Sequence, residues 1–164
     1  MRNYNDLNKN YQSGDLDING EHIDSLAGCP QHITGVFNCR YNNLSSLVGG
    51  PETVDGNYIC RINNLTSLSG CASHIGGSLF IANNPITSLV GIHKIIKSCS
   101  RIFFDDSNIT EGGIGILLIA NLSGFSNNDE QFRIITKYLG TGTKGMMECR
   151  KELIARGYAN YAKL

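Results

Sequence analysis

The sequence predicts an α/β repeat solenoid, a stack of short parallel strands closed by a C-terminal helical cap. Three observations predict it: apolar residues return with a period of 21 residues, glycines return in the same register, and helix-forming residues dominate after Asn127. Fixed periods of this length are typical of solenoids, in which each repeat is one small structural unit. We therefore expect an N-terminal cap or arm over residues 1–13, a solenoid of about five turns over residues 14–112, and a helical cap over residues 113–164.

Each turn carries two apolar residues separated by one position. The first four pairs are Leu16 and Ile18, Phe37 and Cys39, Tyr58 and Cys60, and Leu79 and Ile81. After a two-residue insertion, Ile102 and Phe104 form the fifth pair, with Ser107 and Ile109 continuing the register. Alternation with period two predicts a short strand whose paired residues point inward. Because one turn is too small to bury its own apolar face, the stacking of neighbouring turns must provide the core.

Asparagine and glycine occupy their own columns in the repeat. Asn42, Asn63 and Asn84 follow the strand in three consecutive turns, where an amide side chain can bond the backbone groups that the departing chain leaves free. We expect these residues to form a polar ladder along the solenoid. Glycines recur at Gly28, Gly49, Gly70 and Gly91. The period leaves little room for a full helix on this side of the turn, so we expect tight turns or a single 3₁₀ turn there.

The core of each turn reads L-x-L-x-x-N-x-L, as in residues 37–44 and 58–65, which resembles the leucine-rich-repeat consensus over roughly residues 14–112. A second element, Leu-(Ser/Thr)-Ser-Leu-x-Gly, begins at Leu44 and Leu65. With its helical tail, the chain is similar to small leucine-rich-repeat proteins encoded by tailed bacteriophages. This resemblance implies a non-virion protein that acts in the host cytoplasm, where it binds and inhibits a host protein such as a defence enzyme.

The C-terminal segment predicts two helices. The apolar face of the first comprises Phe132, Ile135 and Leu139. Asn128 or Asp129 can cap its start. We expect residues 140–145 to connect the helices, and residues 146–156 to form the second helix, which ends at Gly157.

Composition limits the possible functions. Fourteen basic and fourteen acidic residues cancel, so no global field draws the protein to nucleic acid or to an anionic membrane. The longest apolar run, residues 114–120, is too short to span a bilayer, and residues 1–14 contain no apolar run of signal-peptide length. We therefore expect a cytoplasmic protein. Cys39 and Cys60 occupy an inward column, so the six cysteines are interpreted as reduced core thiols.

No motif in the chain predicts catalysis. The cysteines form no C-x-x-C pair, and the histidines are scattered at His22, His32, His74 and His93, which we interpret as solvated surface residues. The glycine-rich residues 140–145 lack the order of a phosphate-binding loop and follow a predicted helix. We expect no enzyme activity, no cofactor and no metal site.

The outward face of the strands predicts the candidate site. The residue between the two inward residues of each turn points outward, and in successive turns it is Asp17, Asn38, Ile59, Phe80 and Phe103, so this column changes from polar to apolar. Two further columns follow it in each turn, and their last members are Asp105 and Asp106. Exposed apolar surface rimmed by Arg and Tyr is typical of the energetic centre of a protein interface. The predicted partner-binding residues are Arg40, Tyr41, Ile59, Arg61, Ile62, Phe80 and Phe103.

Two alternatives remain open at this point. The helical tail or residues 114–120 could fold back and cover the strand face, which would make the apolar residues part of the core. Otherwise the protein could be a nucleic-acid-associated accessory protein that binds through basic C-terminal helices, with contacts from Lys137, Lys144, Arg150, Lys151 and Arg156.

Overall fold

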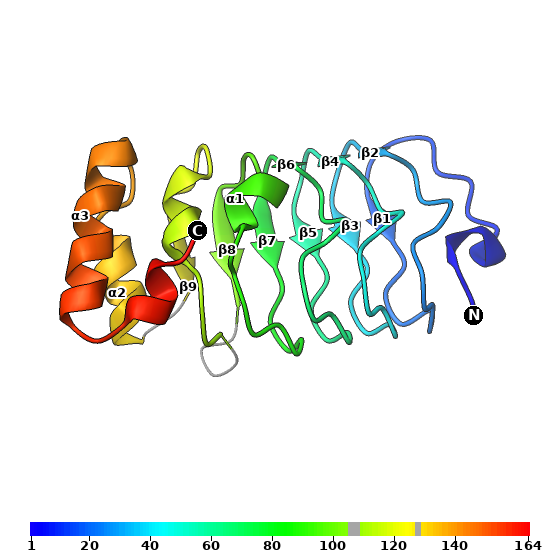
Figure 1. The fold of residues 1–164 in the computed structure, drawn as a ribbon. Coiled ribbons are helices and arrows are strands. Elements are labelled where there is room, and N and C mark those ends of the chain that lie inside the picture. The colour runs from blue at the N-terminus through cyan, green and yellow to red at the C-terminus, as the bar shows by residue number, and fades with distance from the viewer. Residues whose placement is uncertain (105–108, 127–128) are drawn as a thin grey trace.

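The computed structural model describes residues 1–104, 109–126 and 129–164. Over these residues the chain winds into a solenoid of about five turns with a period of about 21 residues (Figure 1). The 3₁₀ helix η1 (Tyr4–Leu7) lies at the N-terminal end of the stack. Helices α2 (Glu130–Thr136) and α3 (Gly142–Ala155) lie at the other end. The predicted stack of short parallel strands with a C-terminal helical cap is confirmed.

The larger sheet runs along one side of the solenoid and has six parallel strands within the described residues. In their spatial order these are β1 (Leu16–Asp17), β3 (Phe37–Asn38), β5 (Tyr58–Ile59), β7 (Ser78–Phe80), β8 (Arg101–Phe103) and β9 (Gly124–Ser126). The register matches the repeat, since Leu16 pairs with Phe37, Phe37 with Tyr58, and Tyr58 with Leu79. The ladder includes β9, which lies beyond residue 112, where we expected the solenoid to end.

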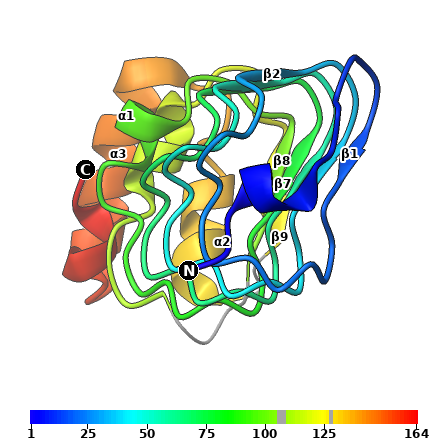
Figure 2. The same cartoon turned by 90° about the vertical axis from the view of Figure 1, so that its right-hand side faces the viewer.

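A smaller sheet occupies a second side of the coil, where the sequence predicted only turns (Figure 2). Its strands are β2 (His32–Ile33), β4 (Thr53–Val54) and β6 (His74–Ile75). The strands form because Ile33, Val54 and Ile75 point into the core, which aligns the backbones of successive turns for parallel pairing. In the fourth turn the short helix α1 (Ile92–Ile95) follows Gly91, so helical structure is not confined to the tail.

The core consists of stacked columns of inward side chains. Phe37 and Tyr58 pack edge to face with ring centroids 5.0 Å apart, and both are fully buried. Gly50 occupies the column in which Cys29 and Cys71 lie in the neighbouring turns. A Cβ atom at Gly50 would lie 2.8 Å from Leu26 Cδ1 and 3.4 Å from Tyr58 Oη. Glycine at this position therefore leaves room chiefly for the Leu26 side chain and the Leu47 carbonyl oxygen, which a Cβ would approach to 3.0 Å.

The asparagine ladder is confirmed. Asn63 Nδ2 donates to the carbonyl oxygens of Cys39 (3.0 Å) and Cys60 (3.1 Å), and Asn63 Oδ1 accepts from the N–H of Leu44 (3.1 Å). Asn42 and Asn84 make the equivalent bonds one turn away on either side. Each amide thus joins two turns and fixes the point at which the chain leaves the strand.

The N-terminal residues cap the first turn. Asn3 and Asp6 form a reciprocal capping box around η1, and Asn3 also bridges in parallel to Ser25. Tyr4 is buried against the core cluster. These contacts cover the apolar face that the first turn would otherwise expose.

The C-terminal cap differs from the prediction in one boundary. α3 begins at Gly142, so the predicted connection over residues 140–145 is partly helical. The reason is that Gly145 is buried with the side chain of Thr141 packed against it, which makes this glycine a point of close packing instead of a turn. The helix ends at Ala155, before the left-handed Gly157 (φ 86°), as expected.

The first tail helix also follows the prediction in part. Phe132 and Ile135 are buried, but α2 ends at Thr136, so Leu139 lies outside it. Asp129 is at the N-cap position and accepts a hydrogen bond from Gln131 Nε2 (3.0 Å), whereas Asn128 lies outside the described residues. The remaining short helices are η2 (Ile114–Leu118) and η3 (Ala159–Ala162). No helix in the described part of the chain has the length and apolar character needed to cross a membrane.

Candidate functional site

Three neighbouring strands place Ile59, Phe80 and Phe103 in one outward column, which we name the apolar ridge. Ile59 pairs with Phe80 and Phe80 with Phe103 in the parallel register, so the three side chains lie on successive turns. Each is partly exposed, whereas the residues that precede Phe80 and Phe103, Leu79 and Ile102, are fully buried. The alternation therefore places the ridge outside the core, as the sequence predicted.

The two phenylalanines stack on each other. Their ring centroids are 4.6 Å apart and their planes differ by 4°. The separation follows the spacing of adjacent strands, which is about 4.8 Å. Because the two facing ring surfaces cover one another, the ridge presents ring edges to solvent between these residues.

Arg40 and Arg61 lie beside the ridge, on adjacent turns. Among the described residues neither guanidinium forms a salt bridge, and the Nε atom of each is buried without a hydrogen-bond partner. The guanidinium carbon of Arg40 lies 5.7 Å from the centroid of the Tyr41 ring, within the range of a cation–π interaction. Because the Nε atoms are buried, both guanidinium groups are held in place, and no carboxylate in the described part of the chain neutralises them.

Tyr41 and Ile62 lie where the chain turns away from the strand, in left-handed backbone. Their φ angles are 53° and 57°, and the equivalent residues Gly20 and Asn83 have φ angles of 69° and 58°. Glycine and asparagine tolerate this conformation, whereas it is strained for a β-branched residue. Two turns thus carry a large side chain at a position where the fold favours a small one. Strain of this kind is concentrated at functional sites.

The outward columns end differently at their two ends. Asp17 is exposed at the N-terminal end of the ridge column, where its Oδ1 accepts a hydrogen bond from the N–H of Asn19 (2.9 Å). Ser126 pairs with Phe103 at the other end. Asp105 and Asp106, which the sequence places in the flanking columns, lie outside the described residues, as does Ser107.

The C-terminal cap leaves the strand face open. In the view along the solenoid axis, β1, β7 and β8 lie on one side of the coil and α1 and α3 on the other (Figure 2). η2, which contains most of the apolar run 114–120, packs against α1 and α3. Hence α1, α3 and η2 lie away from the strand face that carries the apolar ridge.

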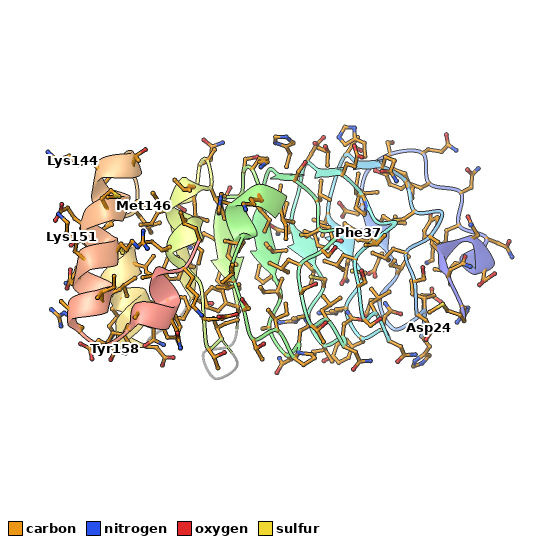
Figure 3. All side chains as sticks on the ribbon, viewed as in Figure 1. Asp24, Phe37, Lys144, Met146, Lys151 and Tyr158 are labelled. Carbon is orange, nitrogen blue, oxygen red and sulfur yellow. The ribbon has the colours of Figure 1, made fainter. Side chains whose placement is uncertain are left out.

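The basic C-terminal residues are largely neutralised. Lys137 and Arg156 contact Glu152 at 2.7 Å and 3.1 Å, and Lys151 contacts Glu148 at 2.9 Å. Lys144 and Arg150 form no salt bridge within the described residues. Figure 3 shows Lys144 and Lys151 pointing away from the solenoid, while Met146 points toward it. Most of the positive charge that could attract nucleic acid is therefore balanced by nearby carboxylates.

The cysteines are placed as core residues. All six are unpaired and buried, as predicted. Burial raises the pKa of the Cys29, Cys71 and Cys149 thiols to about 12, and the pKa values of Cys39 and Cys60 lie well above the ordinary value. These thiols therefore stay protonated near neutral pH, whereas a nucleophilic cysteine requires the thiolate.

The histidines are separate from one another. His32 Nε2 lies 2.9 Å from Asp55 Oδ1, and His74 Nδ1 lies 3.2 Å from Ser98 Oγ, both at the exposed surface. His93 is partly buried, which corrects its interpretation as a solvated residue, and burial is the main cause that lowers its pKa. Over residues 1–104, 109–126 and 129–164, no group of three or more His, Cys, Asp or Glu side chains could hold a metal ion.

Two features of the strand face escape the repeat alignment. Arg101 is exposed on the same face of β8 as Phe103 but is not among the predicted site residues. The left-handed backbone at Tyr41 and Ile62 is also unexpected, although Gly20 and Asn83 in the same column could have indicated it.

No model of a protein family matches the chain, and no curated protein or solved structure shows significant similarity to it.

Proposed function

We propose that this protein is a protein-binding module that recognises its partner through the exposed face of the six-stranded sheet. One observation carries the proposal: the apolar ridge of Ile59, Phe80 and Phe103 lies beside the guanidinium groups of Arg40 and Arg61, which form no salt bridge among the described residues, on a face away from α1 and α3. Aromatic residues and arginine are enriched at the energetic centres of protein interfaces.

The ridge lies outside the solenoid core, and its contact between turns is the stacking of Phe80 on Phe103. The inward columns already bury the apolar surface that joins the turns, and the asparagine ladder already bonds the backbone at the strand ends. The strained positions of Tyr41 and Ile62 add large side chains beside the ridge at a cost in folding free energy of about 1–3 kcal/mol each. A surface that reduces stability in this way is consistent with selection for binding.

The finer description rests on the sequence resemblance. We propose that the solenoid is of the short leucine-rich-repeat type, that it is encoded by a bacteriophage, and that it binds and inhibits a host defence protein in the host cytoplasm. The open strand face is compatible with this role, since extended faces of solenoids are common binding surfaces. Binding of nucleic acid by the C-terminal helices is the weaker alternative, because Lys137, Lys151 and Arg156 already contact carboxylates.

Site-specific photo-crosslinking in the host cell tests the proposal. A photoreactive amino acid replaces either Tyr41, which is 51% exposed on the strand face, or Val48, which is 60% exposed outside it. We expect the probe at position 41 to crosslink to a partner protein and the probe at position 48 to give no such product. The partner is then purified, and its affinity is measured for Phe80→Ser and for the matched control Ile154→Ser on the outer face of α3.

The two substitutions separate the two faces of the molecule. We expect Phe80→Ser to weaken binding by about 2 kcal/mol, as for a central interface residue, and Ile154→Ser to bind normally. Normal binding by Phe80→Ser together with loss of binding by Ile154→Ser would place the interface on the C-terminal helices and overturn the proposal.

A further inference from the structure

Three arginines on the strand face have no acidic partner in the part of the chain that the structure describes. Arg40 and Arg61 flank the apolar ridge on one side and Arg101 flanks it on the other, and none forms a salt bridge within the described residues. Elsewhere the chain balances many of its cations with carboxylates. These paired cations are Arg2, Lys9, Lys137, Lys151, Arg156 and Lys163. The strand face therefore combines apolar surface with positive charge that no carboxylate of residues 1–104, 109–126 and 129–164 neutralises.

The arrangement of Arg40 and Arg61 favours a carboxylate. They occupy the same column on adjacent turns, and adjacent parallel strands are about 4.8 Å apart. Two positive charges on neighbouring turns of one column repel each other, and a bound anion relieves that repulsion. Their buried Nε atoms and the contact between Arg40 and Tyr41 restrict the side chains before any partner binds. A planar guanidinium held in this way can bind a carboxylate through two parallel hydrogen bonds.

The ridge distinguishes a protein segment from a nucleic acid. Single-stranded nucleic acids bind aromatic side chains by stacking bases on open ring faces. Phe80 and Phe103 stack on each other at 4.6 Å, so no ring face between them is free for a base. Their outward edges carry the positive end of the ring quadrupole, which favours aromatic faces and carboxylates of a partner.

We infer that the strand face takes an acidic protein segment, in which Asp or Glu side chains that contact Arg40, Arg61 and Arg101 flank an aromatic or aliphatic side chain seated on the ridge. This inference rests on the proposed function and specifies the chemistry of its partner. Asp17, the carboxylate in the ridge column itself, already accepts a hydrogen bond from Asn19 and lies two turns before Ile59. The acidic residues of the partner are therefore expected to lie over the centre of the sheet, away from β1.

Selection from a random dodecapeptide library tests this inference without knowledge of the natural partner. The immobilised wild-type protein selects displayed peptides, and the enriched peptides are synthesised and measured in solution. We expect an enriched pattern of Asp or Glu on both sides of an aromatic or aliphatic residue. The affinity should fall about tenfold for each of Arg40→Gln and Arg61→Gln, and should fall further between low salt and about 0.5 M salt. The matched control Arg150→Gln, which removes a cation of α3 that forms no salt bridge among the described residues, should bind normally.

The outcomes distinguish this inference from the function on which it rests. Enrichment of neutral or basic peptides that lose binding on Phe80→Ser would overturn the acidic partner but support the strand face as a binding site. Peptides whose affinity is unchanged by Phe80→Ser and Phe103→Ser would overturn both. A labelled oligothymidylate that binds the wild type but not the double variant Arg40→Gln/Arg61→Gln would replace the acidic segment with single-stranded nucleic acid. Enrichment of no peptide would also refute the inference.

Discussion

Leu79 and Phe80 are adjacent in β7 and point to opposite faces of the sheet, so alanine at each position tests which face is core. Leu79 is 0% exposed, and Phe80 is partly exposed and stacked on Phe103. We expect Leu79→Ala to lower the free energy of unfolding much more than Phe80→Ala, although Phe80→Ala removes the larger side chain.

The magnitudes follow from the contacts of each residue. Leu79→Ala leaves a cavity between turns, which costs about 2–5 kcal/mol. Phe80→Ala loses the offset or stacked ring contact with Phe103, which contributes about 0.5–1.5 kcal/mol beyond the area that it buries. Since the Phe80 side chain is already partly solvated, we expect a total loss of about 1–2 kcal/mol. For a chain of 164 residues, each 1 kcal/mol corresponds to a change in Tm of about 2–4 °C.

Urea unfolding followed by circular dichroism measures both variants. A double-mutant cycle with Phe80→Ala and Phe103→Ala then isolates the ring contact, for which we expect a coupling free energy of about 0.5–1.5 kcal/mol. A loss for Phe80→Ala as large as that for Leu79→Ala would refute the reasoning, because it would show that the ring is covered and belongs to the core.

Three further substitutions test the interior. Tyr58 Oη is buried without a hydrogen-bond partner within the described residues, so Tyr58→Phe should stabilise the protein by about 1 kcal/mol in urea unfolding. The control Tyr161→Phe loses a hydrogen bond to the Ile109 carbonyl (2.8 Å) and should destabilise the protein by a similar amount. Asn63→Ala leaves the buried Leu44 N–H without its partner, and it removes one of the two amide donors from each of the Cys39 and Cys60 carbonyls, which keep Asn42 and Asn84. It should therefore lower the free energy of unfolding by about 1–3 kcal/mol, and a loss below about 0.5 kcal/mol would contradict the role of the ladder. Burial holds the pKa of the Cys60 thiol well above its ordinary value of 9.0. Above pH 9.0 the unfolded chain therefore loses the thiol proton that the folded chain keeps. The free energy of unfolding then falls by about 1.4 kcal/mol per pH unit for this thiol. Cys60→Val should therefore show a shallower loss of stability at alkaline pH, and an unchanged slope would contradict the buried, protonated thiol.

The fold of the solenoid follows from the sequence because its stabilising contacts repeat. The pairs of inward residues predict β1, β3, β5, β7 and β8, since every turn meets the same neighbours in the same register. β9 is less evident because its inward residue, Phe125, pairs with Ile102 at a spacing of 23 residues, the same interval that separates Ile102 from Leu79. A longer period after the fourth turn thus extends the ladder beyond the residues that match the original repeat.

The candidate site is predictable in its residues but not in its interactions. Alternation along the strand is enough to place Ile59, Phe80 and Phe103 on the outward face. The stacking of the two rings depends on side-chain rotamers, and the absence of an ion pair at Arg40 and Arg61 depends on carboxylates contributed by all described elements. The period of the repeat does not determine either interaction. The charge and packing of the strand face can therefore be described only from the three-dimensional structure.

The asparagine ladder has a consequence for how such a protein can evolve. Each amide bonds only its own turn and the adjacent one, so a duplicated unit of about 21 residues brings its own amide and can be inserted without new long-range contacts. Each insertion lengthens the sheet by one strand, or about 4.8 Å. The area of the binding surface therefore grows or shrinks in discrete steps. Descendants of this chain can adapt to a partner whose surface changes by gaining or losing whole turns as well as by point substitution.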